Sequence, residues 1–354
     1  MLKPRAALQR LAPYHPPLAG RQGLRLDFNE STIGCSPRVM AVLQQLDAEL
    51  LAQYPERDPV EQEVARFLGL DPAQVLLTNG VDEAIHLVSE CYLEENSEAI
   101  IAVPTFGMYR LYAECTGARM VPVQAGPNFE FPTEALLAAI TPRTRLIAVA
   151  NPNNPTGAVA RRDDLLRLLE AAPNAAVLVD EAYYEFYGET LMDQIGRWPN
   201  LFIARTFSKA YGMAGLRAGV LAADEQQMAV LRRTATPYNV NAVALACLME
   251  ALRDQDYVNN YAAEVRRNRA VLERALGELG FSYWPSRANF VLFRVGDWRN
   301  EFVRGMKEQG ILVRDRSSDP GCEGCVRITV GTDAQMERLI PALRHLAAEA
   351  APKG

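Results

Sequence analysis

Short apolar runs alternate with helical patterns along the middle of this chain, and this alternation constrains the fold more than any other feature. The β-rich runs between about residues 75 and 222 are VLLT, AIIAVP, RMVPV, RLIAVA, AVLVDE, LFIART and AGVLAA. Most of them are separated by helical stretches, which is the pattern of a mainly parallel sheet wrapped by helices. The middle of the chain therefore predicts an α/β domain.

The remainder of the chain predicts a second, smaller domain. After Asp224 the pattern is helical to about Gly280, and then strands and helices are mixed, with the strand-like runs FSYW, NFVLFRV, ILVRD and VRITV. A length of 354 residues also suggests two domains at about 150 residues each. Prolines near the N-terminus, Pro4 and Pro13 among them, prevent one helix there.

These patterns give three expected segments. Residues 1–36 form an N-terminal segment associated with the small domain, 37–245 form the large domain, and 246–354 form the small α+β domain.

Composition narrows the classes of function. The net charge of −6 argues against a nucleic-acid partner, whose phosphates a protein neutralises with basic residues. No apolar run approaches the roughly 20 residues of a membrane span, and the first residues lack the apolar core of a signal peptide. We therefore expect a cytoplasmic protein without a membrane or nucleic-acid partner.

The sequence offers little for metal binding or for a hydrolase triad. Cys322 and Cys325 form a single C-x-x-C, whereas a zinc site needs a second pair of ligands. The only histidines, His15, His86 and His345, are not spaced to supply one. We expect no metal.

Chemically distinctive residues follow several of the predicted strands. Lys209 comes just after LFIART, Asp180 closes AVLVD, Asn154 lies in the turn NPNNPTG, and Val81 and Asp82 begin a helix after VLLT. A Ser-Lys pair after one strand is a weak signal by itself, and Asn154 alone could serve only the turn. Together they supply what pyridoxal 5'-phosphate needs: an amine for its aldehyde, an acid for its pyridine nitrogen, and donors for its ring oxygen and phosphate.

The chain resembles fold-type I, pyridoxal-phosphate-dependent aminotransferases, and within them the histidinol-phosphate aminotransferase family, over nearly its full length. The resemblance rests on the order and spacing of LAPY, LDFNES, YPERD, TNGVDEAIHL, PTFGMY, NPNNPTG, VDEAYYEF, RTFSKAYGMAGLRAG, PYNVNAVA, ILVRDR and VRITVGT. It implies an α/β fold with a mainly parallel sheet and a smaller α+β domain.

The resemblance assigns the catalytic roles. Lys209 forms the Schiff base with the cofactor and then moves the substrate proton, while Asp180 pairs with the pyridine nitrogen. Tyr109 stacks on the pyridine ring, and Phe106 stands where the family often has tyrosine.

The resemblance also implies how the cofactor is held. Asn154 and Tyr183 bond its ring oxygen. Its phosphate is held by the backbone of Val81 and Asp82, by the side chains of Thr206, Ser208 and Arg217, and by Tyr54 from a second subunit. A homodimer with shared active sites follows, unless Tyr54 is only a core tyrosine.

Substrate recognition is expected from Arg327, Arg314, Tyr14 and Asn29, together with Asn154. Two arginines on adjacent strands can clamp a phosphate or a carboxylate. The implied reaction converts L-histidinol phosphate to imidazole-acetol phosphate and passes its amino group to 2-oxoglutarate. One departure leaves the amino donor open: residues 29–34 read NESTIG, where the family commonly has an Asn-Glu-Asn-Pro-Tyr-Gly type sequence.

Three alternatives stay open at this stage. An aromatic amino acid aminotransferase would keep the machinery and change the donor, and a threonine-phosphate decarboxylase would break a different bond in a similar site. A non-catalytic cofactor sensor would need an attached basic DNA-binding domain, and the proline-rich N-terminus is too short to supply one.

Overall fold

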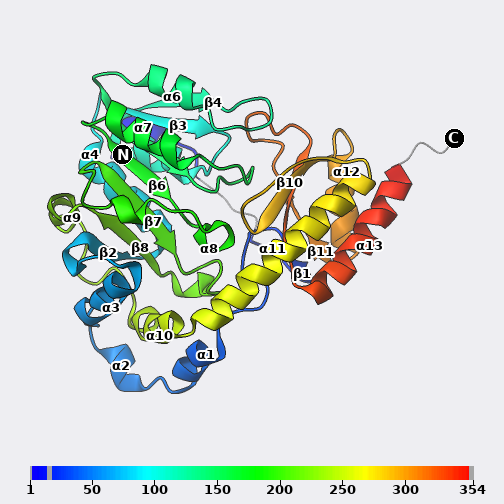
Figure 1. Cartoon of the computed structure of the whole chain (residues 1–354), viewed down its shortest axis with the longest axis horizontal. Helices are drawn as coiled ribbons and strands as arrows, with labels where there is room; N and C mark the ends of the chain where they lie inside the picture. Colours follow the sequence, from blue (N-terminus) through cyan, green and yellow to red (C-terminus); the bar gives the residue numbers. More distant parts are fainter. Residues whose placement is uncertain (1, 14–17, 351–354) are drawn as a thin grey trace.

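A seven-stranded mixed sheet is the largest element of the computed structural model, which describes residues 2–13 and 18–350 (Figure 1). Its strand order is β2-β8-β7-β6-β5-β3-β4. The strands are β2 (Val75–Thr78), β3 (Glu98–Val103), β4 (Arg119–Gln124), β5 (Thr144–Ala150), β6 (Ala176–Asp180), β7 (Leu201–Thr206) and β8 (Gly219–Ala223). β8 alone runs in the direction opposite to the other six strands. The carboxyl ends of the other six strands therefore share one edge of the sheet.

Helices cover both faces of this sheet because its strands are apolar on both sides. Within β2, Leu76 belongs to one buried cluster, while Val75 and Leu77 belong to another on the opposite face, as the two-residue period of a strand requires. The helices on the Leu76 face are α4 (Gly80–Tyr92), α5 (Met108–Thr116) and α9 (Glu225–Leu231). Those on the other face include α6 (Thr133–Ala139), α7 (Arg162–Ala171), α3 (Asp58–Leu68) and α8 (Tyr184–Tyr187).

A second sheet is antiparallel and has the order β12-β13-β10-β9. Its strands are β9 (Ser282–Trp284), β10 (Phe290–Arg294), β12 (Arg314–Asp315) and β13 (Cys325–Thr329). The helices that pack with it are α11 (Gln255–Glu278), α12 (Arg299–Glu308) and α13 (Asp333–Ala350). The long helix α11 runs from beside α10 (Ala242–Arg253) to α12 and α13 (Figure 1).

The N-terminal segment contacts both parts of the fold. The 3₁₀ helix η1 (Ala6–Arg10) packs against α5, and the Arg5 guanidinium donates to the carbonyl of Cys115 at 2.8 Å. Farther along the chain, strand β1 (Leu24–Arg25) lies beside the smaller sheet and pairs in parallel with β11 (Ile311–Leu312). The backbone of Thr329 also donates to the carbonyl of Leu26 at 2.8 Å. The chain then enters α1 (Pro37–Gln44) and α2 (Ala48–Ala52), which pack against α10.

The structure confirms the predicted fold class and refines one of its strands. The run ILVRD is two strands: Ile311 and Leu312 pair with β1, and Arg314 and Asp315 pair with β13. The chain changes partner at Val313. The division at residues 37 and 246 stays a prediction. Within the described part of the chain, no helix has both the length and the apolar character that crossing a bilayer requires.

Candidate active site

The residues expected at the carboxyl ends of the strands line one cavity of about 420 Å³. This cavity lies where ligands bind in open α/β sheets, outside the carboxyl edge. Of the expected site residues, those that line it are Asn29, Val81, Asp82, Tyr109, Asn154, Asp180, Tyr183, Thr206, Ser208, Lys209, Arg217, Arg314 and Arg327. The fold thus brings residues almost 300 positions apart in the sequence, such as Asn29 and Arg327, into one site.

Two expected residues are not among the lining residues. Tyr54 follows α2, is 77% exposed, and stacks on the ring of Tyr238 with 4.2 Å between ring centroids. Tyr14 lies outside the described residues. The contribution of Tyr54 to a second subunit and that of Tyr14 to substrate binding stay predictions.

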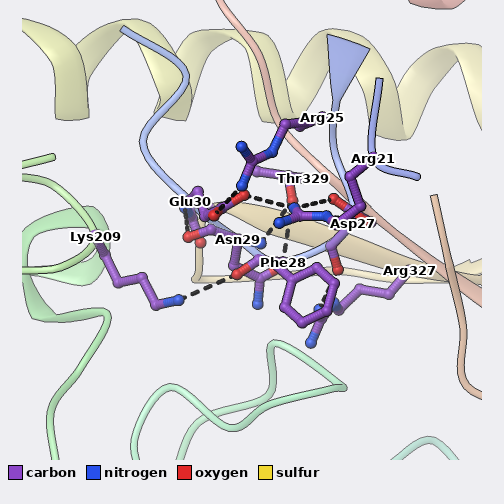
Figure 2. A network of polar contacts seen from close by, with 10 residues as sticks. Arg21, Arg25, Asp27, Phe28, Asn29, Glu30, Lys209, Arg327 and Thr329 are labelled. Carbon is purple, nitrogen blue, oxygen red and sulfur yellow. Dashed lines mark hydrogen bonds and ion pairs between the residues drawn. The ribbon is translucent and has the colours of Figure 1, made fainter. Parts of the chain in front are cut away.

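Lys209 follows β7, and its amine extends into the cavity toward the N-terminal segment (Figure 2). Its Nζ donates to the carbonyl of Phe28 at 3.1 Å. Burial, reinforced by the positive charge of Arg327, lowers the pKa of Lys209 from 10.5 to about 8. Deprotonation of Lys209 at neutral pH therefore costs much less free energy here than in water. The neutral amine that results is the form that attacks an aldehyde.

Asp180 ends β6 and is buried beside Tyr109 of α5 at the wall of the cavity. The Tyr109 hydroxyl donates to Oδ2 of Asp180 at 2.6 Å, and the backbone of Ala182 donates to Oδ1 at 3.0 Å. Burial nevertheless raises the pKa of Asp180 from 3.8 to about 6. A carboxylate accepts about four hydrogen bonds, so Asp180 retains capacity for a pyridinium N–H. The hydroxyl contact of Tyr109 is a further role beside the expected stacking.

Asn154 and Tyr183 each belong to a separate set of hydrogen bonds that reaches β13 of the smaller sheet. Oδ1 of Asn154 accepts from Arg327, which leaves its Nδ2 as a donor for the ring oxygen of a cofactor. The Tyr183 hydroxyl accepts from Nδ2 of Asn29 at 3.0 Å, and Oδ1 of Asn29 accepts from Thr329 at 3.3 Å. The side chain of Asn29 is therefore engaged within the protein, and its contact with substrate stays a prediction.

The N-terminus of α4 forms a cradle that suits a phosphate. Its N-cap residue, Asn79, makes no side-chain cap hydrogen bond, so the first N–H groups of the helix are available. A Cβ on Gly80 would lie 2.5 Å from Nη2 of Arg217 and would displace this guanidinium, and the φ of +73° at Gly80 is one that residues other than glycine rarely adopt. Oγ of Ser208 is buried and has no hydrogen-bond partner among the described residues.

Two further groups in this cradle already have partners. Arg217 bonds Asp82 at 3.0 Å, and Oγ1 of Thr206 accepts from the backbone of Ser208 at 3.1 Å. Arg217 has further N–H groups to offer. A helix N-terminus, a guanidinium and an unpaired hydroxyl together fit the phosphate of pyridoxal 5'-phosphate.

Arg314 and Arg327 lie side by side because they are register partners on β12 and β13. Arg327 is buried, and Nη2 of its guanidinium donates to the carbonyl of Asp27 at 2.8 Å. Burial and the neighbouring arginines lower its pKa from 12.5 to about 10, so it remains charged at neutral pH. This pair makes the end of the cavity away from the cradle an anion site.

The sequence analysis missed several lining residues. Arg316 and Asp319 lie in the segment between β12 and β13, and they form an ion pair at the cavity. Glu30 also lines the cavity, and Arg21 holds it at 2.6 Å while forming a bidentate contact with Asp27 (Figure 2). The motif LDFNES contained Asp27 and Glu30, but only the fold shows that Arg21 orders them.

The ring of Phe28 was also missed. The guanidinium carbons of Arg21 and Arg314 lie 4.2 Å and 5.0 Å from its centroid, within cation–π range. Phe28 thus connects the lysine to the anion site, through its carbonyl on one side and its ring on the other.

A lysine and a buried acid at the carboxyl edge of a mainly parallel sheet, with a phosphate cradle beside them, define a fold-type I enzyme of the pyridoxal-phosphate-dependent class. The sequence profile of the family Aminotransferase class I and II matches residues 21–343. The chain belongs to this family.

Three known proteins illustrate the similarity. A histidinol-phosphate aminotransferase of Thermoanaerobacter sp. (strain X514) is 33% identical, over 91% of this chain and 92% of that one. The crystal structure of a histidinol-phosphate aminotransferase from Sinorhizobium meliloti in complex with pyridoxal-5'-phosphate has a TM-score of 0.89 at 26% identity and covers 99% of both chains. An L-threonine-O-3-phosphate decarboxylase from Porphyromonas gingivalis has a TM-score of 0.81 at 26% identity, over 92% of this chain and 99% of that one.

The predictions of an aminotransferase, of its fold class and of pyridoxal 5'-phosphate as cofactor are confirmed. The individual roles of the site residues are taken up as proposals below. Cys322 and Cys325 are buried and free, in a small apolar cluster with Phe129 and Leu292.

Proposed function

We propose that the chain is a histidinol-phosphate aminotransferase that converts L-histidinol phosphate and 2-oxoglutarate to imidazole-acetol phosphate and L-glutamate. The observation that carries this proposal is the pair Arg314 and Arg327, register partners that line the same cavity as Lys209. The similarity to histidinol-phosphate aminotransferases over most of the chain supports it.

Pyridoxal 5'-phosphate, when bound, would supply the aldehyde that takes up the amino group and the ring that withdraws electrons from the substrate. The cradle at the start of α4 would hold its phosphate, through the backbone of Val81 and Asp82 and the side chains of Ser208, Thr206 and Arg217. Asp180, whose ionised form is unfavourable in its buried setting, would gain a cationic partner in the pyridinium.

Lys209 would be the proton-transfer group. Its pKa of about 8 lies near neutral pH, where a base is able both to accept and to return a proton. Tyr109 and Ala182 hold the Asp180 carboxylate by two hydrogen bonds, which orients it before a ligand enters.

Arg314 and Arg327 would bind the anionic end of each substrate in turn. The donor presents a phosphate there, and 2-oxoglutarate presents a carboxylate, and a guanidinium fork binds either group bidentately. The cation–π contact with Phe28 holds the Arg314 guanidinium beside the segment that accepts the Lys209 hydrogen bond.

We further propose that the enzyme is a cytoplasmic homodimer with shared active sites. Tyr54 is largely exposed within one chain, together with Leu51, which is 63% exposed, and a second copy would cover both. In that arrangement the Tyr54 hydroxyl would reach the partner's cofactor phosphate.

The test compares amino donors on the purified, cofactor-loaded enzyme. L-Histidinol phosphate, L-phenylalanine and O-phospho-L-threonine are supplied separately with 2-oxoglutarate, and kcat/KM, products and carbon dioxide release are measured. The proposal expects histidinol phosphate to be the best donor, without carbon dioxide. A higher kcat/KM for phenylalanine would show that the enzyme is an aromatic amino acid aminotransferase. Release of carbon dioxide from phosphothreonine would show that it is a decarboxylase, which is the second candidate function because of the structural similarity to the threonine-phosphate decarboxylase.

A further inference from the structure

Three guanidinium groups lie on one face of the smaller sheet. Arg314 and Arg327 are cross-strand partners and therefore share a face. The backbone N–H of Arg316 bonds the carbonyl of Cys325 at 3.0 Å, so the extended pairing with β13 continues beyond Asp315. Because side chains alternate along an extended strand, Arg316 returns to the face of Arg314. Asp315 lies on the other face, where it pairs with Arg299 at 3.5 Å.

Arg316 is held against the cavity by Asp319. The two form an ion pair across a turn in which the backbone of Asp319 donates to the carbonyl of Arg316 at 2.9 Å. Their side chains are only 15% and 20% exposed. Both residues line the cavity. The guanidinium is thus fixed at the substrate end and is not a free surface group.

Hydrogen-bond capacity remains unused at this end of the cavity. Nε of Arg316 and Nε of Arg327 are buried, and neither has a hydrogen-bond partner among the described residues. Both Nε atoms are fully buried, so an anion in the cavity would meet the Nη groups of the two guanidiniums, each of which carries two N–H donors and has used at most one in the contacts described. Because the two arginines lie on one face of paired strands, one multivalent anion could contact both.

The local charge balance indicates which anion fits. Arg314, Arg316 and Arg327 contribute three positive charges to this end, and Asp319 contributes one negative charge. Glu30, which also lines the cavity, is already paired with Arg21 and Arg25. A phosphate monoester carries about 1.5 to 2 negative charges at pH 7 and would balance the excess, whereas a monocarboxylate would leave about one positive charge unmatched.

We propose that Arg316, held by Asp319, is a specificity-determining residue that makes the cavity prefer a phosphate over a carboxylate on the bound molecule. The proposal rests on the proposed function, since it concerns the same substrate end. It assigns to Arg316 a contribution beyond the clamp of Arg314 and Arg327, which binds either kind of anion.

The test measures competitive inhibition of the cofactor-loaded enzyme by two probes, O-phosphoethanolamine and β-alanine, which carry a phosphate and a carboxylate on a two-carbon amine. Wild type, Arg316→Gln and Arg316→Lys are compared at pH 7.5. Arg294→Gln is the matched control, because Arg294 belongs to the same sheet but does not line the cavity. Cofactor absorbance and circular dichroism establish that each variant is folded and loaded.

The expected result is a rise of about 10- to 100-fold in the inhibition constant of phosphoethanolamine with Arg316→Gln, and a change of less than about threefold for β-alanine. Arg316→Lys, which keeps the charge without the planar fork, should fall between wild type and Arg316→Gln. Arg294→Gln should match wild type. Equal changes for both probes, or no change for either, would overturn the proposal.

A pH series adds a readout that a purely structural role would not move. The second ionisation of a phosphate monoester lies near pH 6, so phosphoethanolamine should bind wild type more tightly from pH 5.5 to 7.5. This gain should be smaller in Arg316→Gln, and a gain of unchanged size would contradict the proposal. The amino donor in all assays is whichever one wild type uses. Failure of histidinol phosphate as a donor would therefore reject the proposed function without deciding the role of Arg316.

Discussion

Replacing Asp180 by asparagine should stabilise the cofactor-free protein, and the gain should grow with pH. Burial raises the pKa of Asp180 from 3.8 to about 6. The folded protein therefore binds this proton more tightly than the unfolded chain. The contribution of Asp180 to stability is fully present below pH 3.8 and is lost as the pH rises through about 6. Asparagine has no such loss.

The size of the effect follows from the pKa difference. About two pKa units at 1.36 kcal/mol each give about 3 kcal/mol in total, of which about 2 kcal/mol falls between pH 4.5 and 7.5. Tyr109 and Ala182 bond to different oxygens of Asp180. Asparagine can keep Oδ1 as the acceptor for Ala182, and its Nδ2 can donate to the oxygen of the Tyr109 hydroxyl, so the substitution removes the charge and leaves a partner for each group.

The assay is urea unfolding of cofactor-stripped wild type and Asp180→Asn at several pH values. The free energy of unfolding of the variant, relative to wild type, should increase by about 2 kcal/mol from pH 4.5 to 7.5. Asp193→Asn is the control: Arg162 lowers the pKa of Asp193 to about 2, so its difference from wild type should be flat above pH 5. A flat difference for Asp180→Asn would refute the account of its burial. Adding pyridoxal phosphate should favour wild type, because the ionised Asp180 then gains a cationic partner.

Three further predictions concern single groups. Gly80→Ala should weaken cofactor retention by about tenfold or more, measured by equilibrium dialysis, because its Cβ would displace Arg217 and the residue has a φ of +73°; unchanged retention would contradict the cradle. Arg205→Gln should lower the free energy of unfolding by about 3–5 kcal/mol, since it leaves the buried Glu181, 2.8 Å away, without its cation; a loss below about 1 kcal/mol in urea unfolding would be incompatible with this pairing. In cofactor-stripped protein, the rate of Lys209 acylation, followed by mass spectrometry, should rise with pH through a midpoint near 8; a midpoint near 10.5 would show that burial does not perturb the amine.

The sequence predicted most of the large sheet because burial on both faces leaves a clear signal. Runs such as LFIA at residues 201–204 are apolar on both faces of the strand, and they recur between helical patterns. The same logic placed Lys209, Asp180 and Asn154 together, because carboxyl ends of parallel strands share an edge.

What the sequence left unspecified depends on contacts between distant segments. The hydrogen bond from Tyr109 to Asp180 requires α5 to approach the end of β6, and no local pattern encodes that distance. The proposed role of Arg316 depends on the pairing register of β12 with β13. The sequence did not indicate this register, because ILVRD was predicted to be one strand. With that register known, the R-x-R spacing of Arg314 and Arg316 would have indicated a shared face.

The central claim is that Lys209 carries the cofactor and releases it to an amino donor at this cavity. The chain contains only four lysines, Lys3, Lys209, Lys307 and Lys353, so the claim can be tested by peptide mapping after borohydride reduction of the loaded enzyme. The account predicts the cofactor mass on Lys209 alone, and its loss when L-histidinol phosphate is added before reduction. Labelling of another lysine, or a Lys209 label that histidinol phosphate leaves intact, would contradict the account.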